Sequence, residues 1–79
     1  MTREEALQYA KEKLADPTFH DYELIAYILR DNISEDTPYW TLAYLLATGE
    51  YGCSRNDVIG LVELMESEKK EDNNGLQSS

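Results

Sequence analysis

The chain has 79 residues, a formal net charge of −9 and a hydrophobic content of 42%. This length limits it to one domain, whose single core supplies only about 3–5 kcal/mol of net stability. Because 16 Asp and Glu face only 7 Lys and Arg, direct binding to DNA, RNA or an anionic membrane surface is disfavoured, since these modes need clustered cations.

The polar start and the lack of long apolar runs predict the cellular setting. No apolar run approaches the roughly 18 residues of a membrane span, so we expect neither a transmembrane helix nor a signal peptide. Cys53 is the only cysteine and has no partner for an internal disulfide or a multi-thiolate site. These features predict a cytoplasmic protein.

The first predicted helix covers residues 3–15. Thr2 and Glu5 have the spacing of a capping box, in which each side chain bonds to the backbone of the other residue. Pro17 disfavours the helical conformation of the residue before it, so the helix should end near Ala15. The apolar stripe of this helix has spacings of three and four and consists of Leu7, Ala10 and Leu14.

The second predicted helix covers residues 19–31. Thr18 begins a start signal, and Asp21 is an alternative N-cap. The segment is strongly apolar, and the face predicted to be buried consists of Leu24, Ile25, Ile28 and Leu29.

The third predicted helix covers residues 38–48 and has almost no polar face. Pro38 fits the first helical position, which makes Thr37 the expected cap, and Gly49 is a natural left-handed end. A helix that is apolar nearly all round lies either at the centre of a core or against a partner.

The fourth predicted helix covers residues 55–69. Ser54, with Asp57 three residues later, provides its start signal. Gly60 inside its apolar stripe costs about 1 kcal/mol relative to Ala, which predicts that another backbone packs closely there. The stripe itself consists of Val58, Leu61, Val62 and Met65.

These elements predict the fold class. We expect an all-α chain with a single small four-helix domain, built from two helical hairpins, over residues 1–70. Residues 71–79 are polar and acidic in composition and are predicted to form a disordered tail.

The residues that carry enzyme or metal chemistry are sparse. His20 is the only histidine, and a pair with Cys53 would need the turns before the second and fourth helices to meet. No glycine-rich phosphate loop, oxyanion loop or metal-ligand spacing is apparent. We therefore expect no catalytic, cofactor-binding or metal-binding residues and no enzyme activity.

Two groups stand out among the acidic residues. Seven of the 16 fall in or beside predicted first turns, where carboxylates complement the helix dipole: Glu4, Glu5, Asp21, Glu23, Glu35, Asp36 and Asp57. A denser group consists of Glu63, Glu66, Glu68, Glu71 and Asp72. Of these, Glu63 and Glu66 lie in the C-terminal half of the fourth helix, where negative charge opposes the dipole. They form either a solvated face or a surface that contacts a partner.

Tyrosine and tryptophan supply a second candidate surface. Tyr39, Trp40, Tyr44 and Tyr51 surround the most apolar helix, and such side chains are enriched at the centres of interfaces. The alternative is that each ring lies at the margin of the core. Four short helices leave too little interior for all the large apolar side chains, which favours at least one interface.

The first functional hypothesis is therefore a protein-binding inhibitor or adaptor, of the kind that phages and mobile elements encode. Its acidic surface would mimic nucleic acid, and its partner would be a basic nucleic-acid-processing protein. The alternative is a structural homodimer or assembly subunit that uses the aromatic surface for self-association.

In size, acidity and four-helix pattern the chain resembles the nuclease-colicin immunity proteins. This resemblance implies an acidic inhibitor that covers a basic nuclease. The Tyr-Tyr-Pro segment of that family is absent, because the Tyr39-Trp40 pair follows Pro38, so the resemblance assigns no site residue.

Overall fold

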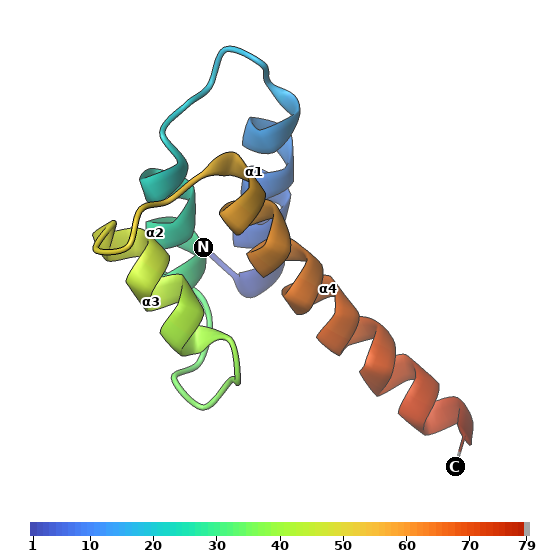
Figure 1. The fold of residues 1–79 in the computed structure, drawn as a ribbon. Helices are drawn as coiled ribbons and strands as arrows, with labels where there is room; N and C mark the ends of the chain where they lie inside the picture. The colour runs from blue at the N-terminus through green and yellow to red at the C-terminus, as the bar shows by residue number, and fades with distance from the viewer. Residues whose placement is uncertain (79) are drawn as a thin grey trace.

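The computed structural model describes the backbone of residues 1–78 and the side chains of residues 1–67. Over this backbone it contains helices and no strand: α1 (Arg3–Ala15), α2 (Tyr22–Asp31), α3 (Trp40–Thr48) and α4 (Arg55–Ser78) (Figure 1). The prediction of an all-α chain of four helices is confirmed. Within the described residues, no helix is long and apolar enough to cross a membrane.

Reciprocal side-chain caps set the starts of the first and last helices. The Glu5 amide donates to Thr2 Oγ1 at 3.1 Å, and the Thr2 amide donates to Glu5 Oε1 at 2.8 Å. Ser54 and Asp57 make the same pair of bonds, at 3.2 and 3.0 Å. Each pair satisfies two backbone donors that the first helical turn leaves unbonded, so both helices begin where the sequence predicts.

The second and third helices begin later than predicted. The α2 helix begins at Tyr22, because Asp21 is the residue that caps it, while the Thr18 hydroxyl donates to Asp16 at 2.7 Å. The predicted cap of α3 is wrong: the Thr37 hydroxyl donates to a backbone carbonyl in the preceding turn. The α3 helix starts at Trp40 with no side-chain cap bond.

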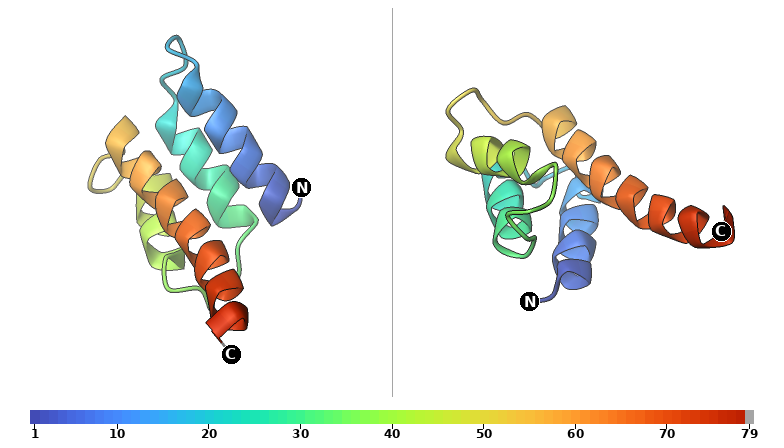
Figure 2. Two further views of the ribbon diagram at one scale, coloured as in Figure 1. Left: turned by 90° about the vertical axis from the view of Figure 1, so that its right-hand side faces the viewer. Right: turned by 90° about the horizontal axis from the view of Figure 1, so that it is seen from below.

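The helices α1 and α2 run side by side in opposite directions, and α2 makes its most extensive contact with α3 (Figure 2). The α4 helix contacts all three of the others. The structure does not confirm the predicted division into two hairpins, because the main contact joins α2 to α3 across that division.

The core lies where the four helices meet, and every helix contributes buried apolar residues: Ala6, Leu7, Ala10, Leu14, Ile25, Ala26, Leu29, Tyr39, Ala43, Leu46, Val58, Leu61, Val62 and Met65. The predicted stripes of α1 and α4 are confirmed. The predicted face of α2 is partly wrong, because Leu24 is exposed and Ile28 is only half-buried. Ile25 and Leu29 of the predicted face are buried, and Ala26 is buried with them.

The α4 helix is longer than predicted and projects beyond the other helices (Figures 1 and 2). It reaches Ser78, whereas the pattern predicted an end near residue 69. Lys70 and Glu71 have high helix propensity and no proline follows them, although the run from Asp72 to Gly75 has low propensity. The predicted flexibility of residues 71–79 stays a prediction, since side chains from residue 68 onward lie outside the described part.

The prediction that another backbone packs closely against Gly60 is wrong. A Cβ atom added to Gly60 would have no neighbouring atom within 4 Å. Gly49, in contrast, ends α3 with a φ of 68°, in the left-handed region that favours glycine. The conformational freedom of glycine is therefore needed at Gly49 and not at Gly60.

Candidate functional site

Four side chains from α2 and α3 form a continuous stack at the surface. In order they are Tyr27, Arg30, Tyr44 and Trp40, and we call them the aromatic row. The Arg30 Cζ atom lies 4.6 Å from the centre of the Tyr27 ring and 5.6 Å from that of Tyr44. The Tyr44 and Trp40 rings stack at 5.4 Å with an interplanar angle of 26°.

Helical spacing explains how the aromatic row forms. Tyr27 and Arg30 are three residues apart on α2, and Trp40 and Tyr44 are four residues apart on α3, so each pair shares one face of its helix. The extensive contact between α2 and α3 then brings the two pairs together. Arg30 links them through cation–π contacts, each worth about 0.5–1 kcal/mol at an exposed site.

A pocket of about 330 Å³ opens beside one end of the row. It is lined by Arg30, Asp31, Ile33, Glu35, Trp40 and Tyr44. The Arg30 Nη2 atom lies 3.4 Å from the Asp31 carboxylate, so this pair is compensated in charge. Glu35 adds a second carboxylate to the lining, and the pocket as a whole combines aromatic faces with negative charge.

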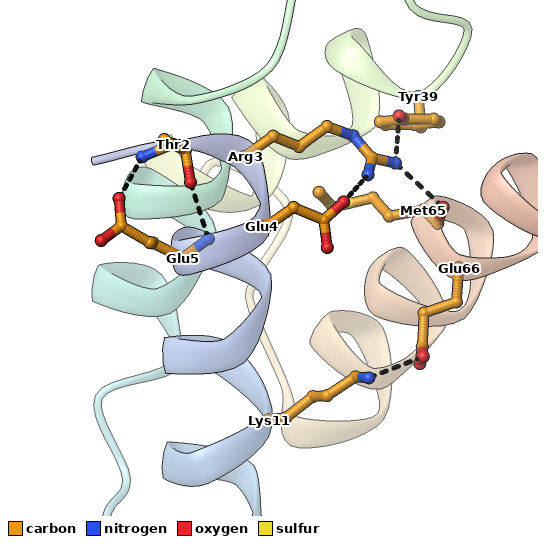
Figure 3. A network of polar contacts seen from close by, with 8 residues as sticks. All are labelled: Thr2, Arg3, Glu4, Glu5, Lys11, Tyr39, Met65 and Glu66. Atoms are coloured by element: carbon orange, nitrogen blue, oxygen red, sulfur yellow. Dashed lines mark hydrogen bonds and ion pairs between the residues drawn. The ribbon is translucent and has the colours of Figure 1, made fainter.

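Tyr39 does not belong to this surface, although the sequence placed it there. It is only 5% exposed, and its hydroxyl accepts a hydrogen bond from Arg3 Nη2 at 3.1 Å (Figure 3). The same nitrogen donates to the Met65 carbonyl oxygen at 2.9 Å. Tyr39 is therefore a core residue, whereas Trp40 beside it lines the pocket.

Tyr51 and Tyr44 are both exposed but lie in different places. Tyr51 is 79% exposed, in the turn between α3 and α4, and it does not line the pocket. Tyr44 is 42% exposed within the aromatic row. The structure brings together Trp40 and Tyr44 from the predicted set, and a binding role for Tyr51 stays a prediction.

The predicted acidic residues of α4 differ in what the structure shows of them. Glu66 pairs with Lys11 of α1 at 2.7 Å (Figure 3), so a cation offsets its charge. Glu63 is exposed, and the Glu68 side chain lies outside the described residues. Within the described part, Glu63 is the predicted α4 carboxylate that remains open to a partner.

Cys53 is half-buried, and its thiol is a poor nucleophile near neutral pH. Burial raises the pKa of its thiol from 9.0 to about 11, and the charges of Glu23, Asp57 and Asp21 add to this effect. A protonated thiol is a poor nucleophile. His20, the other residue considered for catalysis, packs edge-on against Tyr22 at 6.3 Å, and neither residue enters the proposals below.

The sequence analysis did not assign four side chains to this site: Tyr27, Arg30, Asp31 and Glu35. The Tyr27 and Arg30 spacing on α2 was visible as a helical neighbour pair. This pair becomes part of a larger surface only because α3 brings Tyr44 against Arg30, and no local sequence pattern specifies that packing.

Comparisons of this chain with protein families, curated proteins and solved structures found no match.

Proposed function

We propose that this protein is a non-enzymatic inhibitor or adaptor that binds a larger, basic nucleic-acid-processing protein through the aromatic row and the carboxylates beside it. The observation that carries the proposal is the exposed stack of Tyr27, Arg30, Tyr44 and Trp40 next to an acidic pocket. The proposal includes a cytoplasmic setting and an origin in a phage or mobile element.

The stacked geometry suits a contact surface. Tyr and Trp side chains supply large contact area at low cost in side-chain entropy. Arg30 holds Tyr27 and Tyr44 from both helices, so the rings are ordered before a partner arrives. Such preorganisation lowers the entropic cost of association.

The charge of the chain supports the choice of partner. A net charge of −9 attracts a basic protein at long range and accelerates encounter at low salt. Glu35 at the pocket and the exposed Glu63 of α4 provide carboxylates that take the place of phosphates, whereas the charge of Asp31 is offset by Arg30. The same net charge opposes close approach of two copies of this chain.

Affinity capture combined with light scattering tests the proposal. The chain should be monomeric at micromolar concentration. It should capture a basic nucleic-acid-processing protein from the cells that carry its gene, release it at high salt, and inhibit its activity once both are purified. Tyr44→Leu keeps apolar bulk but breaks the stack, and it should abolish capture.

Leu64→Ala is the matched control, because Leu64 is an exposed apolar residue on α4 outside the row. It should leave capture unchanged. A stable dimer that Tyr44→Leu converts to a monomer would instead establish the self-association alternative. Equal capture by both variants would remove the aromatic row as the contact surface.

A further inference from the structure

The pocket beside the aromatic row has the chemistry of a site for one particular side chain. Resting on the function proposed above, the geometry points to this pocket as the binding site for an arginine side chain of the basic partner. The guanidinium lies against the Trp40 indole and pairs with the Glu35 carboxylate. The pocket volume of about 330 Å³ lies at the lower end of the range for small-ligand sites, which begins at about 300 Å³.

The indole of Trp40 has unused capacity for a cation. It is half-buried, lines the pocket and stacks on Tyr44. Among residues 1–67, the cations found over aromatic rings are Lys13 and Arg30, and their rings are those of tyrosine and phenylalanine. Tryptophan is the aromatic side chain that attracts cations most strongly, so an incoming cation gains most at Trp40.

Glu35 is the carboxylate available to that cation. Asp31 pairs with Arg30 at 3.4 Å, whereas no ion pair of Glu35 is found among the described side chains. Arg30 and Asp31 offset each other, and Glu35 leaves the lining with an excess of negative charge. A second cation is therefore accepted beside Arg30.

Arg30 itself shows how this surface holds a guanidinium. Its Cζ atom lies over two tyrosine rings, and its Nη2 contacts a carboxylate. Trp40 and Glu35 offer a second set of the same two groups. Arginine fits this set better than lysine, because the planar guanidinium stacks on a ring while it bonds to a carboxylate through two nitrogens.

Trp40 is the only tryptophan, so its indole N–H resonance reports directly on the pocket. The ¹⁵N-labelled chain is titrated with N-acetyl-arginine amide, N-acetyl-lysine amide and N-acetyl-citrulline amide at constant ionic strength. Arginine should shift the indole resonance saturably, and lysine should bind about fivefold more weakly. The uncharged citrulline compound should cause no saturable shift, and a shift as large as that with arginine would overturn the proposal.

Variants of two neighbouring carboxylates distinguish a specific ion pair with Glu35 from attraction by the overall negative charge. Glu35→Gln should weaken arginine binding about fivefold. Asp36→Asn removes an exposed charge next to Glu35 that does not line the pocket, and it should leave binding unchanged. Equal losses of affinity in both variants would contradict an ion pair between the ligand and Glu35. Equal affinity for the lysine and arginine compounds would contradict the choice of arginine.

The outcome is distinguishable from that of the proposed function. If a basic partner is captured through Tyr44 but the arginine probe produces no shift at Trp40, the pocket assignment is overturned while the proposed function stands. If the probe binds as described but no partner is captured, the pocket assignment stands and the proposed function fails.

Discussion

The Tyr39 hydroxyl accepts a hydrogen bond from the Arg3 guanidinium at 3.1 Å, and the same nitrogen of Arg3 donates to the Met65 carbonyl oxygen. This contact joins the first turn of α1 to the start of α3 and the middle of α4. It holds Tyr39 in the core and thereby directs the adjacent Trp40 toward the pocket.

Tyr39→Phe removes the acceptor of this bond while it keeps the ring. We expect the free energy of unfolding to fall by about 1 kcal/mol, the net value of a typical intramolecular hydrogen bond. Urea denaturation followed by circular dichroism measures the change. Tyr51→Phe is the control, because the exposed Tyr51 ring should tolerate the substitution within about 0.5 kcal/mol. Equal losses in the two variants would show that the Arg3 contact adds no stability.

The contrast between Tyr39 and Trp40 shows what the sequence predicts and what it leaves open. Helix starts at Thr2, Asp21 and Ser54 follow from caps within three residues, and the buried stripes of α1 and α4 follow from helical periodicity. An apolar segment without a polar face does not indicate which side is buried. That choice depends on the packing of α2 and α4 against α3, which lies beyond local sequence.

The same reasoning explains the candidate site. The sequence named Trp40 and Tyr44 because interfaces favour their residue types. It passed over Arg30, which links its helical neighbour Tyr27 to Tyr44 of α3 through a tertiary contact. It also grouped Glu66 with Glu63 because both lie where negative charge opposes the helix dipole, although among the described side chains Lys11 of α1 pairs with Glu66 and not with Glu63.

Gly60→Ala should stabilise the protein. Gly60 lies inside α4, and an added Cβ atom would have no neighbour within 4 Å. Alanine restricts the unfolded chain and has the higher helix propensity, so we expect a gain of about 0.5–1 kcal/mol in the free energy of unfolding. Thermal and urea unfolding check this value, and a loss of stability would reveal a close contact at this position.

Gly49→Ala should have the opposite effect, with a loss of about 1–2 kcal/mol, because Gly49 has a φ of 68°. An added Cβ atom would also lie 2.8 Å from the Glu23 Cδ atom. The same substitution in a Glu23→Ala background separates the two causes. If backbone strain dominates, as we expect, most of the loss persists there; complete recovery would assign the loss to Glu23.

The Cys53 thiol should react slowly. Because burial raises its pKa to about 11, little thiolate is present near neutral pH, and alkylation by iodoacetamide should be much slower than for the unfolded chain. The rate should rise as the pH approaches the raised pKa. Glu23→Gln removes the largest charge contribution and should lower the pKa, whereas Glu50→Gln should leave the rate unchanged. Fast alkylation of the folded chain at neutral pH would contradict this assignment.

The same shift predicts a dependence of stability on pH. Between the ordinary pKa of 9.0 and the folded value of about 11, the unfolded chain loses the thiol proton that the folded chain keeps. The contribution of Cys53 to stability is therefore present below about pH 9 and decreases as the pH rises toward 11. Comparison with Cys53→Ala isolates this contribution, because the two proteins differ only at this position. Parallel stability curves would argue against the raised pKa.

The Lys11 and Glu66 pair distinguishes a structural acid from an available one. Their charged atoms lie 2.7 Å apart, and both side chains are partly exposed, so a double-mutant cycle with Lys11→Met and Glu66→Gln should give a coupling of about 0.2–1 kcal/mol that decreases in salt. Glu63→Gln paired with Lys11→Met should give no coupling.

Partner binding should depend more on Glu63 than on Glu66. We expect a larger loss of affinity for Glu63→Gln than for Glu66→Gln, because the charge of Glu66 is already offset by Lys11. A larger loss for Glu66→Gln would mean that the partner displaces Lys11.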